Sequence, residues 1–389
     1  MVALCKYFGK CGGCTGQHVD YETQLENKKR MLFHTLKNKE SDFSMDNIKV
    51  FSDNEYHYRN RMDMIFHNNG IGFRERGNWK KIIDIDKCVI SNEKLNELIE
   101  EVRIFSTKVD KDENKKVDAF DIIKQTGTFR YAVIRTPQKD SSISFVLNSD
   151  SSKISEAQEL IKEFSKQSSA NNILVTFVPK KTDMSISEDF FVVKGNEMLH
   201  ETYLGKKFQY HIQGFFQNNS VMAEKMHEYV NGLLKNYGEK TKDAHLLDLY
   251  GGVGTFGIIN ADLFRSVKIV EEFKGSIETA EVNIKNNDVK NAEAIAMDAK
   301  NLRKIENKLQ DPLFVITDPP RSGMHPKTIL QLKHLEPEVI IYISCNVKQL
   351  SKELPKFRNY KIKSAALFDL FPQTLHSEGI IELVKQKEV

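Results

Sequence analysis

The 389-residue sequence is poor in cysteine and tryptophan and has no long apolar run. Its five cysteines are an odd number, which excludes a complete set of internal disulfides. No stretch of about 18 apolar residues occurs, so we predict no membrane-spanning helix. The first residues, MVALCKYFGKCGGC, lack the apolar core and small-residue cleavage site of a signal peptide. We therefore expect a cytoplasmic protein without a membrane partner, and nothing in the sequence indicates an obligate protein partner.

An excess of charge of one sign is also absent, because 57 Lys and Arg stand against 54 Asp and Glu. This balance neither supports nor excludes nucleic-acid binding, since a local basic face can exist within it. Basic residues do gather between positions 59 and 81, with aromatic side chains among them. They are Arg59, Arg61, Arg74, Arg76, Lys80 and Lys81, with Tyr58, Phe73 and Trp79. Such a mixture suits stacked, charged RNA, although a solvated β-hairpin face would have the same composition.

The pattern of apolar residues divides the chain into two parts. Helical spacing over 21–36 is followed by strand-like alternation between about 50 and 215. We expect antiparallel hairpins over 119–150 and 173–215, and helices over 92–105 and 155–165. From about residue 219, helices alternate with short apolar strands, as in a parallel, doubly wound sheet. The predicted fold is α/β, with a cysteine loop over 1–20, an α+β region over 21–210 and a doubly wound domain over 211–389.

A glycine-rich turn follows an apolar strand in HLLDLYGGVGTFGI, residues 245–258. Gly251, Gly252 and Gly254 let a ligand approach the backbone, and such turns bind nucleotide-like ligands in doubly wound folds. The next strand ends in Glu271, about 20 residues later, where a carboxylate suits a ribose diol. The turn has neither the GxGxxG of dinucleotide folds nor the lysine of a phosphate-binding loop. S-adenosylmethionine (SAM) therefore fits better than NAD.

Two further motifs follow predicted parallel strands, so we expect both at the same edge of the sheet. They are DPPRSG, residues 318–323, and SCN, residues 344–346. Cys345 is a candidate nucleophile, and the helix N-terminus after it is expected to lower the pKa of its thiol. The alternative is a buried structural cysteine. In the last loop, His376 and Glu378 are either proton acceptors facing this edge or solvated hairpin residues.

Two smaller features leave alternatives open. Asp298 follows a short strand and either meets an adenine amino group or caps the helix after it. Cys5, Cys11 and Cys14 crowd into ten residues, which in a cytosolic protein indicates metal or cluster binding more than disulfides. The CX3CX2C signature of radical SAM enzymes is absent, so we exclude radical chemistry.

Five motifs occur in the order GFFQNN, DLYGGVGTFG, DPPRSG, YISCN and FPQTLHSE. With YRNRMDM at 58–64 and GFRERGNWKKIIDIDKC at 72–88, they resemble the motif series of RNA uracil-C5 methyltransferases, which make 5-methyluridine in tRNA and 23S rRNA. The resemblance spans nearly the whole chain. It implies a Rossmann-like SAM-dependent methyltransferase sheet and an RNA partner. It also implies a [4Fe-4S] cluster on Cys5, Cys11, Cys14 and Cys88, with zinc as the alternative because spacing alone does not separate them.

The resemblance also implies roles for single residues. Cys345 would add to C6 of the uracil, Glu378 would remove the C5 proton, and Asp318 would orient the base. Phe215 would lie beside a flipped uridine, which we expect in a loop or unpaired region of the RNA. The implied cofactor set is Gln217, Asp248, Tyr250, Gly251, Gly252, Gly254, Glu271, Asp298 and Asp318, and the RNA contacts are Arg59, Arg61 and Arg74.

We expect 23S rRNA as the substrate, with the T-loop uridine of tRNA as the alternative. Some rRNA-directed members carry an OB-like domain before the cysteines. Only four residues precede Cys5, so we expect the central region to recognise RNA. A non-catalytic RNA-binding iron–sulfur protein is a rival, but it would not need Cys345, Glu378 and the glycine turn together. A SAM enzyme acting on an exocyclic amine or a small molecule is a third possibility, which the separate SCN cysteine disfavours.

Overall fold

The computed structural model describes residues 2–109 and 117–386, which form two compact units. The described parts of Met1–Asp20, Asn54–Glu201 and His211–Ser220 make up unit 1. Those of Tyr21–Asp53, Thr202–Tyr210 and Val221–Val389 make up unit 2. This division differs from the boundary that we expected near residue 210. Residues 21–53 belong with the C-terminal sheet, and residues 211–220 belong with the central region.

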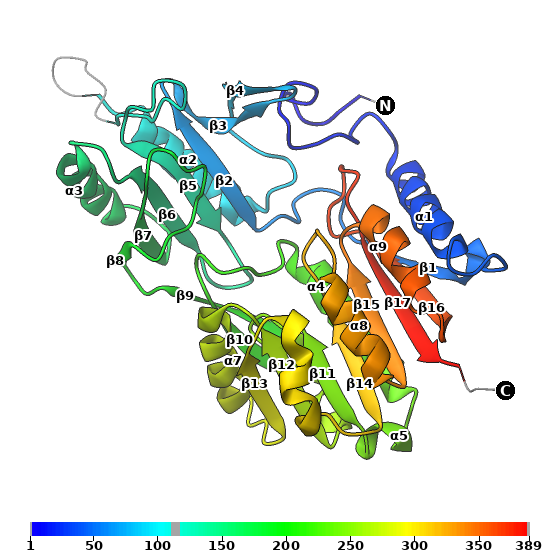
Figure 1. The fold of residues 1–389 in the computed structure, drawn as a ribbon. Coiled ribbons are helices and arrows are strands. Elements are labelled where there is room, and N and C mark those ends of the chain that lie inside the picture. Colours follow the sequence, from blue (N-terminus) through cyan, green and yellow to red (C-terminus); the bar gives the residue numbers. More distant parts are fainter. Residues whose placement is uncertain (1, 110–116, 387–389) are drawn as a thin grey trace. The chain divides into compact units, whose positions relative to one another are not determined.

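Unit 2 is built on an eight-stranded sheet (Figure 1). Every pairing is parallel except those of β17, which runs antiparallel to both of its neighbours. The central strands β11, β14 and β15 are mostly apolar and buried at every residue, as expected for parallel strands covered on both faces. The strand order is β1 (Ile48–Phe51), β16 (Tyr360–Phe368), β17 (Glu378–Lys385), β15 (Val339–Ser344), β14 (Leu313–Thr317), β11 (His245–Leu249), β12 (Ser266–Glu271) and β13 (Ala292–Ala296).

Helices connect and cover these strands, which confirms the predicted α/β fold. The α-helices are α1 (Tyr21–Lys37), α4 (Ser220–Lys235), α5 (Glu239–Lys242), α6 (Thr255–Asn260), α7 (Lys274–Asn286), α8 (Pro326–Leu335) and α9 (Val347–Glu353). Four 3-10 segments, η1 (Met45–Asn47), η2 (Ala261–Leu263), η3 (Ala299–Lys308) and η4 (Leu354–Lys356), complete the unit. In Figure 1, α8 and α9 lie on the same face of the sheet, in front of β14 and β15.

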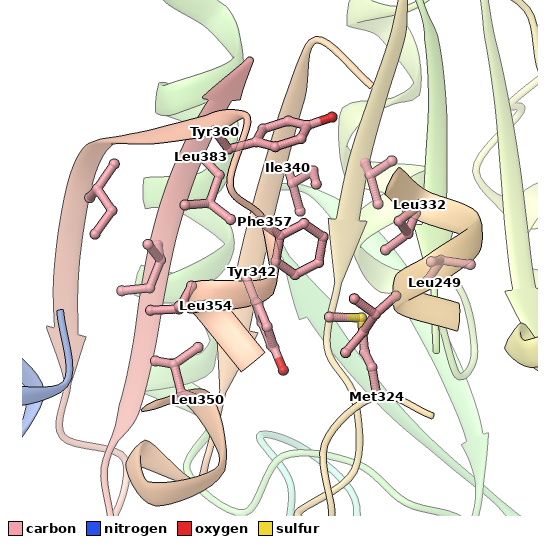
Figure 2. Packing of buried hydrophobic residues seen from close by; sticks show 14 of the residues in the cluster. Leu249, Met324, Leu332, Ile340, Tyr342, Leu350, Leu354, Phe357, Tyr360 and Leu383 are labelled. Atoms are coloured by element: carbon pink, nitrogen blue, oxygen red, sulfur yellow. The ribbon is translucent and has the colours of Figure 1, made fainter. Parts of the chain in front are cut away.

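One buried cluster explains why α1 belongs to unit 2. Leu32 and Leu36 of α1 are fully buried in the same cluster as residues of β15, β16 and β17. Figure 2 shows part of this cluster, where Tyr342, Leu354 and Phe357 pack together. Burying a leucine side chain contributes roughly 1.5–3 kcal/mol, so the two leucines help to hold the helix against this sheet.

Unit 1 contains a seven-stranded sheet with two helices, α2 (Glu93–Ser106) and α3 (Ile154–Ser165). The antiparallel pairing predicted within 119–150 and 173–215 is confirmed for β5 with β6 and for β7 with β8. Between these two hairpins, β6 and β7 are parallel, a pairing for which we made no prediction. A parallel neighbour needs a crossover connection, which here contains α3. The strand order is β4 (Asn78–Asp84), β3 (Gly70–Glu75), β2 (Arg61–His67), β5 (Phe129–Arg135), β6 (Ser142–Asn148), β7 (Asn172–Val178) and β8 (Phe190–Lys194). Strands β9 (Met198–Tyr203) and β10 (Lys206–His211) form a separate two-stranded sheet.

Candidate active site

Three loops of unit 2 leave the carboxyl ends of adjacent parallel strands. Leu249 of β11 pairs with Thr317 of β14, and Thr317 pairs with Tyr342 of β15. The chain then enters the glycine turn, the DPPRSG loop and the SCN loop, respectively. Beside them, Gly379 of β17 pairs with Ser344 in the antiparallel direction. Continuing this register by one residue places Glu378 opposite Cys345, as neighbouring strand residues face each other across a sheet.

Cys345 is half-buried and has two acidic neighbours. Its pKa is raised to about 11, first by burial and then by the nearby charges of Glu378 and Asp318. Our prediction that a helix N-terminus lowers this pKa is therefore wrong for the RNA-free protein. The helix after it, α9, has only seven residues, and two carboxyl groups close to the sulfur oppose its thiolate form. In this state the thiol keeps its proton at neutral pH.

The pKa values of the two carboxyl groups, Glu378 and Asp318, are both raised. Burial raises the pKa of Glu378 well above its usual range, and the charge of Asp318 adds to this effect. Glu378 is only 5% exposed. Burial also raises the pKa of Asp318 to about 7. Carboxyl groups with raised pKa values can exchange protons near neutral pH, which suits general acid–base catalysis.

The glycine turn is held in place by the two acidic residues predicted beside it. The Oδ2 atom of Asp248 accepts the backbone N–H of Gly257 at 2.8 Å, which anchors α6 to the end of β11. The backbone N–H of Gly252 donates to Oε2 of Glu271 at 3.2 Å. Gly254 has a φ of +88°, which favours glycine. The glycine turn and the Glu271 carboxylate therefore lie next to each other. A Cβ added at Gly252 would meet no atom within 4 Å, so the space beside this backbone is open. This open backbone and adjacent carboxylate fit a ligand with a ribose.

Two more residues of the predicted cofactor set, Asp298 and Tyr250, lie in defined local environments. Asp298 caps η3, accepting the backbone N–H of Lys300 at 3.0 Å. Its carboxylate also pairs with the Lys300 ammonium at 2.5 Å, so the capping alternative is confirmed. Tyr250 has a φ of 60°, unusual for a non-glycine residue, and packs against the large buried cluster of unit 2.

Sequence reasoning missed two residues that organise this edge. The Asn346 side chain donates to the backbone carbonyl of Arg321 at 2.9 Å, which joins the SCN loop to the DPPRSG loop. Arg321 lies near Cys345, and its positive charge lowers the pKa of the thiol. This effect is smaller than the raising effects of burial, Glu378 and Asp318. Its guanidinium is also 3.4 Å from Nδ1 of His376. The only available signal was the position of both residues inside the two motifs.

A buried polar clamp on α1 was also missed. The Lys28 ammonium pairs with Asp369 at 2.6 Å, with side-chain exposures of 3% and 0%, and also donates to the carbonyl of Phe371 at 3.2 Å. One helical turn earlier, the side-chain N–H of Gln24 donates to the side-chain oxygen of Gln373 at 3.1 Å. The backbone N–H of Gln373 donates in return to the side-chain oxygen of Gln24 at 3.2 Å. The clamp therefore fixes α1 to the loop that leads into Glu378.

Phe215 and Gln217 belong to unit 1, whereas the glycine turn, Asp318, Cys345 and Glu378 belong to unit 2. The Phe215 side chain is 75% exposed. The Asn60 side chain donates to the carbonyl of Gln217 at 3.4 Å, and Arg135 donates to the carbonyl of Gly214 at 2.5 Å. These bonds hold the GFFQNN segment to the seven-stranded sheet of unit 1.

The three arginines predicted to contact RNA make hydrogen bonds within unit 1. Arg59 donates to the carbonyl of Arg61 at 2.9 Å. The Arg61 guanidinium donates two hydrogen bonds to the carboxylate of Asp63, at 2.9 and 3.0 Å. Arg74 donates to both carboxylate oxygens of Asp183, at 2.9 and 2.7 Å. Each arginine is therefore held in a fixed direction by protein groups.

The four N-terminal and central cysteines lie close together as free thiols. Burial raises the pKa of Cys14 to about 12, and the nearby thiols of Cys88, Cys11 and Cys5 contribute. Tyr7 donates to Asp86 at 2.7 Å, which ties the N-terminal loop to the segment carrying Cys88. A site with four thiols within electrostatic reach fits a thiolate-ligated metal group. However, no group of three His, Cys, Asp or Glu side chains in the described ranges 2–109 and 117–386 is arranged to hold a metal ion.

A doubly wound sheet with an acid-flanked glycine turn is an arrangement that binds nucleotide-like ligands, and it is consistent with the class of SAM-dependent methyltransferases. The model of the family described as tRNA (Uracil-5-)-methyltransferase matches residues 20–386. The chain therefore belongs to this family, and it is a SAM-dependent RNA (uracil-C5)-methyltransferase with an RNA substrate. Family membership argues against the rival readings of a non-catalytic binding protein and of an enzyme acting on amines or small molecules.

Individual relatives agree with this assignment. The chain is 33% identical over 385 residues to tRNA (uracil(54)-C(5))-methyltransferase of Pyrococcus abyssi, covering 98% of this chain and 85% of that protein. Identity to the protein of the same name from Pyrococcus horikoshii is 34% over 384 residues, covering 98% and 86%. The crystal structure of the P. abyssi protein with S-adenosyl-L-homocysteine matches with a TM-score of 0.76 and 30% identity, covering 96% of this chain and 86% of that chain.

Within the described residues, no helix has the length and apolar character needed to span a bilayer.

Proposed function

We propose that the protein methylates C5 of the T-loop uridine of tRNA through a covalent intermediate on Cys345. The observation that carries this proposal is the convergence of Cys345, Glu378 and Asp318 at the edge of the sheet that also carries the glycine turn. The two Pyrococcus relatives are named for uracil 54 of tRNA. These names support tRNA, our alternative reading, better than the 23S rRNA that we expected.

The proposed chemistry assigns one task to each of three side chains. The Cys345 thiolate adds to C6 of the uracil, which makes C5 a carbon nucleophile. SAM, which the glycine turn and Glu271 would hold, would supply the methyl group that C5 accepts and would leave as S-adenosylhomocysteine. Glu378 then takes the proton from C5, and the bond between C6 and sulfur breaks to release the thiolate. A carboxylate whose pKa is raised is a stronger base than an ordinary glutamate.

The remaining predicted residues have supporting roles in this proposal. Asp318 orients the uracil, since its carboxyl lies close enough to raise the pKa of both Cys345 and Glu378. Phe215, with its exposed ring, stacks beside the flipped base, and Gln217 contacts SAM. Arg59, Arg61 and Arg74 face the RNA. The buried Asp248 shapes the turn through its bond to Gly257, whereas Asp298 acts mainly as a helix cap.

The substrate is tested with radiolabelled SAM and three unmodified transcripts: tRNA, the same tRNA with uridine 54 replaced by cytidine, and 23S rRNA. After digestion, we expect label in 5-methyluridine from the first transcript only. The cytidine transcript is the matched control, because it keeps the tRNA fold and lacks the acceptor. Label in 23S rRNA alone would keep the chemistry and overturn the proposed substrate.

We also propose that Cys5, Cys11, Cys14 and Cys88 hold a [4Fe-4S] cluster, which would tie the N-terminal loop to unit 1 as a structural group. Anaerobically purified protein should absorb broadly near about 400 nm and contain about four irons per chain. Replacing Cys11 with serine should remove this absorbance, whereas Cys345→Ser should retain it. A colourless protein with one zinc ion per chain would contradict the cluster and support the zinc alternative.

A further inference from the structure

Unit 1 contains a groove that the proposed chemistry does not use. It is lined in part by residues of β3 and β4 and has a volume of about 360 Å³. Figure 1 shows where these two strands lie. This volume falls in the range of small-ligand pockets, about 300–1,000 Å³. Trp79, the only tryptophan of the chain, lines it with 53% of its surface exposed. Ile123, 65% exposed, lines it as well. The exposed indole of Trp79 offers a flat aromatic face on which a nucleic-acid base can stack.

Cations accompany the aromatic rings of this groove. The Arg74 guanidinium lies 5.9 Å and the Lys80 ammonium 5.6 Å from the centre of the Trp79 ring. On the facing segment, the Arg130 guanidinium lies 4.2 Å from the centre of the Phe120 ring. Arg74 is fixed by its two hydrogen bonds to Asp183. Little conformational entropy is therefore lost when a ligand meets this cation and ring.

The charge of the groove selects an anionic ligand. Four cationic side chains line it, Arg74, Lys80, Lys81 and Arg130, against two carboxylates, Asp121 and Asp183. Three of these cations already have partners: Arg74 pairs with Asp183 and Lys81 with Glu75, each at 2.7 Å, and the buried Arg130 donates to the carbonyl of Pro179. Lys80 has no ion pair among the salt bridges of the described residues, so its ammonium is available for a phosphate. An exposed indole with neighbouring ammonium groups matches a nucleotide, whose base stacks on the ring while its phosphate meets the lysine.

We propose that this groove binds an unpaired nucleotide of the RNA substrate, with the base stacked on Trp79 and the phosphate against Lys80. This inference rests on the proposed function in one respect, since RNA is taken as the ligand. The site is formed by unit 1 alone and contributes to RNA affinity rather than to the chemical step.

The single tryptophan makes the proposal directly measurable. Intrinsic fluorescence of the full-length protein is titrated with unmodified tRNA and with a single-stranded oligouridylate. We expect quenching by both, because a stacked base contacts the indole. Trp79→Ala should weaken tRNA binding and raise the KM for tRNA about 5- to 150-fold, the range for losing one base–aromatic stack. The kcat at saturating tRNA and the KM for SAM should stay unchanged, and Trp79→Tyr should restore most of the affinity.

Two further variants separate stacking from charge and from general surface effects. Lys80→Ala should reduce the slope of the salt dependence of tRNA binding by about one. Ile104→Ala, which removes another exposed apolar side chain of unit 1 outside the groove, should leave binding unchanged. An unquenched tryptophan together with a wild-type KM for Trp79→Ala would overturn the site, even if methylation proceeds. Quenching by RNA without methylation of any RNA would keep the site and contradict the proposed function instead.

Discussion

Replacing Cys345 with alanine should lower the rate of uracil methylation by more than about 10⁴-fold, the scale of losing an essential nucleophile. Without the sulfur, C6 of the uracil has no covalent partner and C5 remains a poor nucleophile. Because the glycine turn is contributed by a different strand end, the affinity for SAM should not change. Single-turnover methylation of tRNA and equilibrium binding of SAM measure the two quantities. A variant that still methylates at a comparable rate would exclude Cys345 as the nucleophile.

Glu378→Gln is the matched variant, because glutamine keeps the shape of the side chain and cannot accept the proton. We expect a decrease of about 10²- to 10⁴-fold in turnover, the usual contribution of a general base. Unlike the Cys345 variant, it should accumulate a covalent complex with tRNA, since addition and methyl acceptance precede proton removal. Accumulation is detected as a protein–RNA band in a denaturing gel. Loss of both the band and the activity would indicate that Glu378 acts before the adduct forms.

Replacing Lys28 with methionine should produce the largest loss of stability in unit 2. The substitution leaves the carboxylate of Asp369, fully buried, without its cation, and breaking a buried ion pair in this way costs about 3–5 kcal/mol. In hydrogen–deuterium exchange, opening of the peptides that contain α1 and residues 369–378 should become about 10²- to 10³-fold more frequent.

Two controls separate the buried pair from its surroundings. Arg30 forms an exposed pair with Glu26 on the same helix, with side-chain exposures of 61% and 44%, so Arg30→Ala should change stability by less than about 1 kcal/mol. Burial lowers the pKa of Lys28 and raises that of Asp369, which means that desolvation opposes both charges. Combining Lys28→Met with Asp369→Leu should therefore recover most of the loss. Equal exchange in Lys28→Met and Arg30→Ala would contradict the clamp.

The edge on which the site lies could be predicted because it depends on local sequence. The apolar runs LFVIT and VIIYIS form β14 and β15, and the residues after parallel strands meet at one edge. This rule alone predicts that Asp318, Cys345 and the glycine turn lie at the same edge of the sheet. The rule does not place Glu378, because its position depends on β17 pairing between β15 and β16 in the antiparallel direction. The residues of the last loop left its role open between a proton acceptor and a solvated hairpin residue, and only the family resemblance favoured the first.

The features that sequence reasoning missed all depend on contacts between distant parts of the chain. Lys28 looks like one of many solvated charges of an amphipathic helix, and its partner is 341 residues away. The pKa of Cys345 was predicted from the helix that follows it, whereas burial and carboxyl groups from two other strand ends raise it. The parallel pairing of β6 and β7 was missed because short apolar strands look alike in either direction.

The central claim, covalent catalysis at Cys345 on a tRNA uracil, is tested most directly with tRNA transcribed with 5-fluorouridine. The fluorine at C5 cannot be removed by a base, so the adduct should persist once C5 has accepted the methyl group from SAM. After nuclease and protease digestion, mass spectrometry should identify one modified peptide. We predict that it contains Cys345 linked to methylated 5-fluorouridine and that it forms only with SAM present. A linkage to another cysteine, or methylation of ordinary tRNA with no adduct on the fluorinated transcript, would contradict the account.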